Sequence, residues 1–387
     1  MEVNKLTKLN NWLADFITAH MGILYLWAVV LISVLIRYKL FQFESGDMLY
    51  YLLPWMEEIT AGGGFATLKS SIGNYNIPYM VILTIISSVT DDAAVRMFAV
   101  KFVSSLFDYL LAFSVYGILR RSCREKEAVL GFAVIILNPV ILLNSAFWGQ
   151  CDIIYVFFII AAFYFCIREK WLYAFVFMGI AVAFKLQAAF FMPILVLFWL
   201  KKKFHFLYFL LIPATYLVMC LPAVMAGRPF FEILGIYGEQ VHMTRGMISS
   251  YPNIWNFFRG SVRDFYWVSY LFTIFILGSG FYCFWCRKAF KGSSLTALAV
   301  WNWWTCVMFL PSMHERYGLV AEVLLLLYVL LYRKYFEVCA GMYFVTLVAY
   351  SKYLFGQEPI SIIYISVINL LLYLYFSYML FISEKQK

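Results

Sequence analysis

Residues 152–200, DIIYVFFIIAAFYFCIREKWLYAFVFMGIAVAFKLQAAFFMPILVLFWL, form an almost continuous apolar run that decides the fold class. Charged residues interrupt this run only at residues 168–170 and at Lys185, which is followed closely by Gln187. Because a helix needs about 20 apolar residues to cross a bilayer, the run predicts one helix of ordinary length and two short ones. The stretch therefore indicates an all-α membrane protein.

The whole chain has the same character. Of its 387 residues, 64% are apolar and only 13% are charged, which excludes an ordinary soluble enzyme. The other runs that qualify as spans lie near residues 22–40, 95–119, 128–146, 205–226, 265–286, 295–311, 317–332, 336–354 and 360–382. We therefore expect a single transmembrane domain over residues 1–387, with about twelve transmembrane helices.

Lysine and arginine clusters predict the orientation of these helices. The clusters lie at Lys5 and Lys8 and at residues 120–126, 168–170, 201–203, 287–291, 333–334 and 385–387. If all are cytoplasmic, both termini are inside, and residues 41–94 and 227–264 form outer loops. The run at 77–89 is then too short for a span and is expected to be a re-entrant or juxtamembrane helix on the outer side. We expect a bacterial plasma membrane protein whose net charge of +9 reflects anchoring to membrane lipid and not nucleic-acid binding.

The outer segment 41–94 carries the candidate catalytic acid. Asp47 stands just after the first span and next to Gly46, which permits a tight turn or close approach of a substrate. Glu57 and Glu58 have the pattern of a solvated helix face, and Glu44 remains an undecided second candidate. We therefore expect Asp47 to be the catalytic residue of this loop.

A second group of polar residues precedes the apolar helix at 152. Asp152 has the position of a helix N-cap. Alternatively, Trp148, Gln150 and Asp152 line a cavity and offer a flat apolar surface and hydrogen-bonding groups to a hydroxylated ligand. The two interpretations are compatible.

Cationic residues follow at two further breaks between apolar segments. Lys185 could extend to the outer interface, but half-length helices at membrane depth require a cavity, where Lys185 and Gln187 would contact a phosphate. His314, Glu315 and Arg316 could simply pair with one another. Alternatively, the histidine and the arginine bind a phosphoryl group beside an outer cavity.

Charged residues also occur in the loop 227–264 and within one apolar helix. The loop 227–264 carries Arg245 among polar and aromatic residues, and fits either a lid over an outward cavity or a solvated loop. Asp108 lies within an apolar helix and is expected to be a structural hydrogen-bonding group.

Six motifs in order resemble the multi-pass GT-C glycosyltransferases. They are SGD after the first span, NYNIPY, LNPVILLNSAFWGQCD, FKLQAAFFMP, YPNIWNFF and MHERYGL. The nearest resemblance is to bacterial relatives of the GPI mannosyltransferases, with a more distant similarity to the dolichyl-phosphate-glucose glucosyltransferases. The resemblance covers about residues 41–320.

The resemblance implies a GT-C-like bundle and an inverting hexosyltransferase that acts on the outer face. The donor would be a polyprenyl-phosphate sugar, with undecaprenyl phosphate as the expected carrier, and the acceptor an envelope glycan or a lipid-linked molecule. Asp47 occupies the place of the family's essential acid. Lys185, His314 and Arg316 correspond to donor-phosphate contacts, and Asp152 to the polar corner of the cavity.

The expected chemistry follows from charge. The leaving phosphate gains negative charge, which Lys185, Arg316 or Arg245 would stabilise. Asp47 would accept the proton of the attacking hydroxyl as a general base, a role typically worth 10² to 10⁴-fold.

The sequence predicts no metal and no cofactor. Asp47 is followed by Met48 and Leu49, so the paired acidic motif of some relatives is absent. The close pair Cys283 and Cys286 has no second cysteine pair and no neighbouring histidine, which would be needed to complete a metal site. The main alternative function is a transporter or flippase of lipids or glycolipids, but the internal repeats expected of one are not found.

Overall fold

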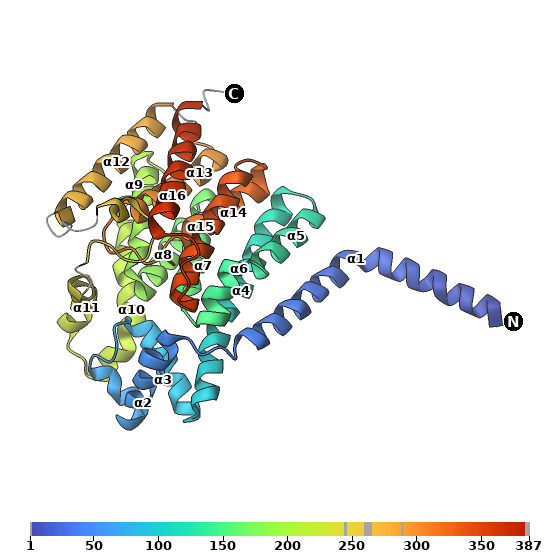
Figure 1. Ribbon diagram of the computed structural model, residues 1–387, viewed down its shortest axis with the longest axis horizontal. Helices are drawn as coiled ribbons and strands as arrows, with labels where there is room; N and C mark the ends of the chain where they lie inside the picture. The colour runs from blue at the N-terminus through green and yellow to red at the C-terminus, as the bar shows by residue number, and fades with distance from the viewer. Residues whose placement is uncertain (1, 244–245, 259–264, 288–289, 384–387) are drawn as a thin grey trace.

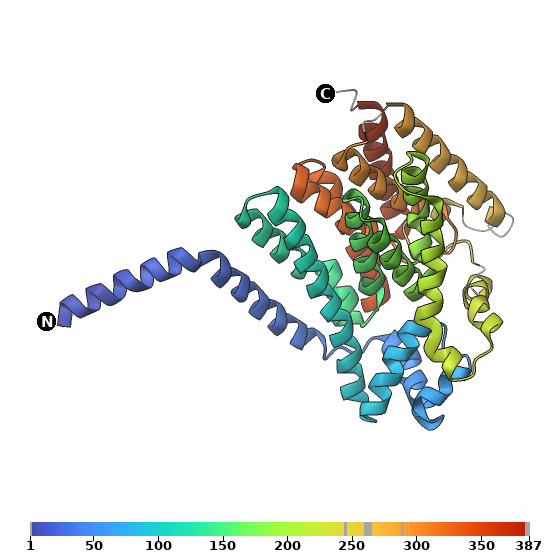
Figure 2. The same ribbon diagram turned by 180° about the vertical axis from the view of Figure 1, so that it is seen from behind.

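The computed structural model describes residues 2–243, 246–258, 265–287 and 290–383, and the regular structure in these segments is helical (Figures 1 and 2). Short 3₁₀ and π turns supplement the α-helices. The α-helices are α1 (Glu2–Leu40), α2 (Leu53–Ala61), α3 (Ile77–Val89), α4 (Ala93–Ser122), α5 (Glu125–Ile136), α6 (Pro139–Leu142), α7 (Asp152–Ile167), α8 (Trp171–Phe184), α9 (Met192–Leu200), α10 (Leu211–Met225), α11 (Phe230–Met243), α12 (Tyr266–Arg287), α13 (Gly292–Phe309), α14 (Leu319–Tyr332), α15 (Phe336–Phe355) and α16 (Ile362–Tyr378).

The prediction of about twelve spans is not confirmed. Each predicted run is helical, but only six described segments are long and apolar enough to cross a membrane, or seven if the bent pair at 125–148 is one span. α7, α8 and α14 contain 16, 14 and 14 residues. At 1.5 Å per residue, they are about 21 to 24 Å long, less than the roughly 30 Å of a hydrocarbon core. These helices are short because the chain breaks beside the polar residues of the candidate site.

The centre of the bundle is formed by helices that lie away from its surface. α13 is buried from residue 295 to residue 309, and α14 is buried over most of its length. α7 packs against α4, α8 and α14. α1, in contrast, projects from the body of the protein (Figure 1), and only 11% of its most apolar window is buried. The long outer helices therefore surround a core of short, buried ones.

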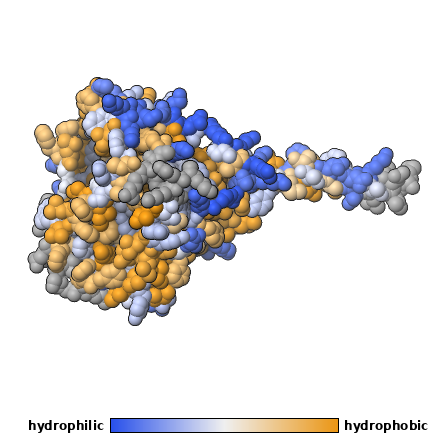
Figure 3. Space-filling model, turned by 90° about the horizontal axis from the view of Figure 1, so that it is seen from above, coloured by the Kyte–Doolittle hydropathy of each residue, from blue (hydrophilic) through white to orange (hydrophobic). Residues whose placement is uncertain are grey.

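The two ends of the bundle differ in charge. At one end, basic residues in the turns between helices contact neighbouring turns or helices. Arg333 pairs with Glu127 at 3.1 Å, Lys203 pairs with Glu169 at 2.7 Å, and the Lys201 ammonium lies 3.5 Å from the ring centroid of Trp285. Figure 3 shows this end from above, with hydrophilic residues gathered toward the side from which α1 projects. The C-terminal end of the chain lies here, whereas α2 and α3 lie at the opposite end (Figure 1).

α3 begins and ends at the predicted residues and is 13 residues long. Asn76 caps its first turn, because the side-chain oxygen accepts a hydrogen bond from the amide of Ile77 at 2.8 Å. With α2 it forms the small helical layer at the end of the bundle where the candidate site lies (Figure 1).

Candidate active site

Asp47 is held by three hydrogen bonds from distant parts of the chain. Its carboxylate accepts bonds from Trp148 Nε1 at 3.0 Å, from Tyr353 Oη at 2.7 Å and from Gln150 Nε2. The side chain is half-buried, so its carboxylate is fixed but not sealed from solvent. Asp47 therefore presents a carboxylate of fixed orientation at the start of the segment between α1 and α4.

The turn around Gly149 brings two of these partners to Asp47. Gly149 has φ +83°, a left-handed backbone conformation that favours glycine, and a Cβ atom there would also lie 2.9 Å from Met48 Cε, so the Met48 side chain would have to shift. Ser45 connects the segment before Asp47 to the turn at Gly149, because its hydroxyl donates a hydrogen bond to the Trp148 carbonyl at 2.7 Å. The tight turn directs both Trp148 and Gln150 toward Asp47.

A buried network of two anions and two cations lies next to this carboxylate. Asp152 pairs with Lys185 and lies 3.1 Å from Arg316 Nε. That second contact is an ion pair and not a well-aligned hydrogen bond. Arg316 also donates to Glu315 at 3.0 Å, and the side chains of Asp152 and Glu315 are 0% exposed. With two positive and two negative groups, the network is charge-balanced without a substrate.

Aromatic rings surround the cations. The Lys185 ammonium lies 5.4 to 5.8 Å from the ring centroids of Tyr75, Tyr155 and Tyr317. The Arg316 guanidinium lies 5.3 Å from the Trp148 ring, whose indole N–H contacts Asp47. These cation–π contacts stabilise the charges and connect the network to the catalytic candidate.

Burial perturbs the groups around the network. Burial, and then the charges of Arg316 and Lys185, lower the pKa of His314 to about 4, so its imidazole is neutral near pH 7. Burial also raises the pKa of Cys151 to about 12, which keeps this residue a thiol. Burial alone would lower the pKa of Arg316, but Asp152 and Glu315 outweigh it and raise the value. Arg316 is thus held in its charged form beside the Lys185–Asp152 pair.

Two cavities adjoin these residues. One, of about 550 Å³, is lined by Lys185, Gln187, His314 and Arg316 and by aromatic side chains. The other, of about 420 Å³, is lined by Tyr353, Lys352, Glu358 and Ser249 among others. Arg316 faces the first cavity, and Tyr353, which faces the second, donates to Asp47. Asp47 itself lines neither of these two cavities: Tyr353 connects it to the second, and Trp148, whose ring contacts Arg316, connects it to the first.

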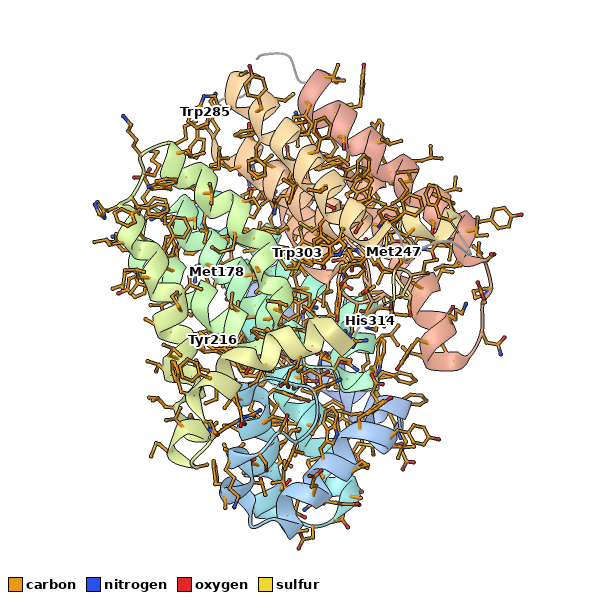
Figure 4. All side chains as sticks on the ribbon, turned by 90° about the vertical axis from the view of Figure 1, so that its left-hand side faces the viewer. Met178, Tyr216, Met247, Trp285, Trp303 and His314 are labelled. Carbon is orange, nitrogen blue, oxygen red and sulfur yellow. The ribbon has the colours of Figure 1, made fainter. Side chains whose placement is uncertain are left out.

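The described part of the loop 227–264 contacts the candidate site. It contains α11, whose Gln240 donates to the Asn74 carbonyl at 2.7 Å and lines the larger cavity. Figure 4 shows His314 at the end of α11, below Met247. The backbone of residues 247–251 is bonded to residues 312–313. Arg245 lies outside the described residues.

The structure brings most of the predicted site residues together. Trp148, Gln150, Asp152, Lys185, Glu315 and Arg316 form one connected set with Asp47, while Gln187 and His314 line its cavity. The interpretation of Lys185 as an interfacial side chain is wrong, because it points inward to Asp152. Asp152 acts as an ion-pair partner, and no capping bond of its side chain is found in the described chain.

Other predictions concern residues outside the set. Asp108 is structural as predicted, because it pairs with Arg37 at 2.8 Å and accepts a bond from Ser145. Glu57 and Glu58 are exposed on α2.

Sequence reasoning missed Tyr353, which lies next to Lys352 in the last turn of the helix α15 and belongs to none of the motifs quoted above. It also missed Tyr75, whose hydroxyl donates to Gln150 Oε1 at 3.2 Å, although the NYNIPY motif contains it.

Among the described residues, no cluster of three or more histidine, cysteine or acidic side chains could hold a metal ion. The arrangement instead offers a fixed carboxylate beside a cavity with two cations and aromatic walls. Such a site suits a sugar that carries a phosphate, because rings stack on sugar faces and cations bind phosphate oxygens.

Comparison with known proteins supports this chemistry. Residues 74–201, about a third of the chain, match the sequence model of a family described as MptA_B family, alpha-(1->6)-mannopyranosyltransferase, N-terminal domain. The matched segment includes Trp148, Gln150, Asp152 and Lys185, whereas Asp47 and Arg316 lie outside it. No curated protein sequence matches the chain. The resemblance to GT-C glycosyltransferases is thus confirmed over residues 74–201, which match a mannosyltransferase family of that type.

Proposed function

We propose that this protein transfers a hexose, with inversion, from a polyprenyl-phosphate carrier to an envelope glycan or lipid-linked acceptor on the outer membrane face. The mannosyltransferase match supports a glycosyltransferase and makes mannose the first sugar to test. The observation that carries the proposal is the placement of Asp47 beside the network of Asp152, Lys185 and Arg316. The match favours transfer over the transport alternative.

The larger cavity is suited to the donor. Its aromatic wall, which includes Tyr266, Trp267 and Tyr270, can stack on a sugar ring. Lys185 and Arg316 lie at its edge and would bind the phosphate, while neutral His314 would exchange a hydrogen bond with it. As the bond to the anomeric carbon breaks, the phosphate oxygen gains charge, and these fixed cations stabilise it.

Asp47 would act as the general base. The acceptor hydroxyl transfers its proton to the carboxylate while its oxygen bonds to the anomeric carbon, and the carrier phosphate leaves with the bonding electron pair. Inversion requires the acceptor to approach from the side opposite the phosphate. The smaller cavity is the candidate path for the acceptor, because Tyr353 in its wall donates to Asp47, whereas Arg316 lines the larger cavity.

The outward orientation rests on charge. The site lies at the end of the bundle that carries α2 and α3, opposite the basic turns around Lys203 and Arg333. Positively charged loops prefer the cytoplasm, so the site would face outward, where polyprenyl-phosphate sugars serve envelope synthesis.

The proposal is tested with the purified full chain in lipid nanodiscs. Polyprenyl-phosphate mannose and the corresponding glucose donor are supplied with lipid-linked acceptors, and the product's anomeric configuration is determined by NMR. D47N keeps the shape and removes the base, so we expect a loss of about 10² to 10⁴-fold. E58Q, which removes an exposed carboxylate from α2, is the matched control.

Two outcomes would contradict the proposal. Unimpaired transfer by D47N would end the assignment of the base. Absence of transfer with every donor, together with donor movement between leaflets of proteoliposomes, would support the transporter instead.

A further inference from the structure

Lys101 is a buried cation whose partners are backbone carbonyls. It lies on α4 and is 0% exposed. Its ammonium donates to the carbonyls of Phe41 at 3.2 Å and Leu40 at 3.5 Å, and also to that of Phe43. In the described part of the chain, no carboxylate lies within 4.0 Å of it. Glu44 is an anion that acts on Lys101 from beyond this distance. A buried ammonium with no carboxylate in direct contact is costly, so its position calls for an explanation.

The three carbonyls belong to the segment that leads into Asp47. α1 ends at Leu40, and the last carbonyls of a helix lack partners within that helix. The positive charge of Lys101 satisfies these carbonyls and opposes the negative end of the helix dipole. It thereby fixes the chain four residues before the catalytic candidate.

The same side chain also contacts the other half of the site. A Cβ atom at Gly149 would lie 3.4 Å from Lys101 Cγ and 3.6 Å from Cε, so the lysine stem packs directly against this glycine. Gly149 lies between Trp148 and Gln150, which both donate to Asp47. Lys101 therefore contacts both segments whose separation determines the geometry around Asp47.

We propose that Lys101 is a positioning residue, which holds the end of α1 and the turn at Gly149 at the separation that orients the Asp47 carboxylate. The inference rests on the proposed function, because it assigns Asp47 the role of base. Lys101 bonds to backbone carbonyls and lines neither of the two cavities, so it acts on the reaction by positioning Asp47 and not by contacting a substrate there.

K101M tests this inference because methionine keeps most of the stem and removes the ammonium. Misplacement of a reacting group by about 1 Å can cost about 10²-fold. We expect kcat to fall about 10 to 100-fold, with the donor KM changed less than about threefold. K101R, which restores donors to the carbonyls, should recover at least about fivefold of the lost kcat, and it remains informative if K101M does not fold.

R96M is the matched control. Arg96 is also buried on α4. It donates to the Thr90 carbonyl at 2.8 Å, to the Thr60 hydroxyl at 2.6 Å and to Asp91, which is exposed, at 2.9 Å, but not to the segment before Asp47. We expect R96M to lower the unfolding temperature without the loss in kcat. Equal kcat losses in R96M and K101M would assign Lys101 a merely structural role.

A double-mutant cycle separates this inference from the proposed function. Groups that act as a unit have non-additive effects, so K101M should cost less than about twofold further in the D47N background. Additive losses, or a folded K101M with kcat within about twofold of wild type, would overturn the inference. Full activity of D47N would instead overturn the proposed role of Asp47.

Discussion

Replacing Arg316 by methionine tests the electrostatics of the site. Its guanidinium lies 3.1 Å from Asp152 and 3.0 Å from Glu315, and both carboxylates are fully buried. Without it, Asp152 keeps Lys185, but Glu315 keeps only His314, which is 4.0 Å away and neutral near pH 7. Because a buried charge is then left without a cation, we expect the free energy of unfolding to fall by about 3 to 5 kcal/mol.

The same change should weaken catalysis for a different reason. A hydrogen bond to a charged group contributes about 1.5 to 3 kcal/mol. Since each 1.4 kcal/mol is a factor of ten, R316M should lower kcat/KM for the donor by about 10 to 100-fold. R316K should be intermediate, because an ammonium on a shorter, flexible stem cannot bridge Asp152 and Glu315 as the planar guanidinium does.

The double variant E315Q/R316M separates the two effects. It neutralises the carboxylate that R316M leaves unpaired, so it should recover most of the lost stability and none of the lost activity. Thermal unfolding and single-turnover transfer are measured on the same nanodisc samples, with R96M as a control for the loss of a buried arginine. If R316M keeps its kcat/KM within about twofold, the phosphate assignment is wrong. If the double variant is as unstable as R316M, the account of the buried network is wrong.

Three further results are expected. G149A should have a free energy of unfolding lower by about 1 to 2 kcal/mol, because alanine disfavours φ +83° and its Cβ would displace the Met48 side chain. It should also be slower in transfer, and thermal unfolding of the variant checks the loss of stability. Because the pKa of His314 is 6.5 in the unfolded chain and about 4 in the folded chain, acidification from pH 6.5 to pH 4 protonates the unfolded chain preferentially. The unfolding temperature should therefore fall as the pH is lowered over this window, and it should fall less in H314N. In a cysteine-free background, E58C should react with an impermeant maleimide on intact cells, and K202C only after lysis; the reverse pattern would place the site in the cytoplasm.

Local features of the sequence predicted the elements of the fold well. The run at 77–89 is one helix of the expected length, since its apolar residues are bounded by Asn76 with Pro78 at the start and by polar residues at the end. Lys185 was correctly placed at a break between two short helices. Such signals are local, so they are readable without the tertiary structure.

The number of spans was not predictable in the same way. Hydropathy cannot distinguish a helix buried in protein from one in lipid, because both require apolar side chains. α14 illustrates this: its residues are apolar enough for a span, yet the helix has only 14 residues and most of them are buried by its neighbours. Tyr353 was missed for a different reason, since it meets Asp47 only in the folded chain, across a separation of 306 residues in sequence.

The charge balance of the site bears on how a donor could be bound and activated. In the structure, Lys185 and Arg316 are already paired with Asp152 and Glu315. A donor phosphate would therefore share its cations with fixed carboxylates, which limits binding of the ground state. As the leaving oxygen gains charge, its attraction to both cations grows while the carboxylates remain unchanged. A network of this kind favours the transition state over the bound substrate, which is the difference that accelerates a reaction.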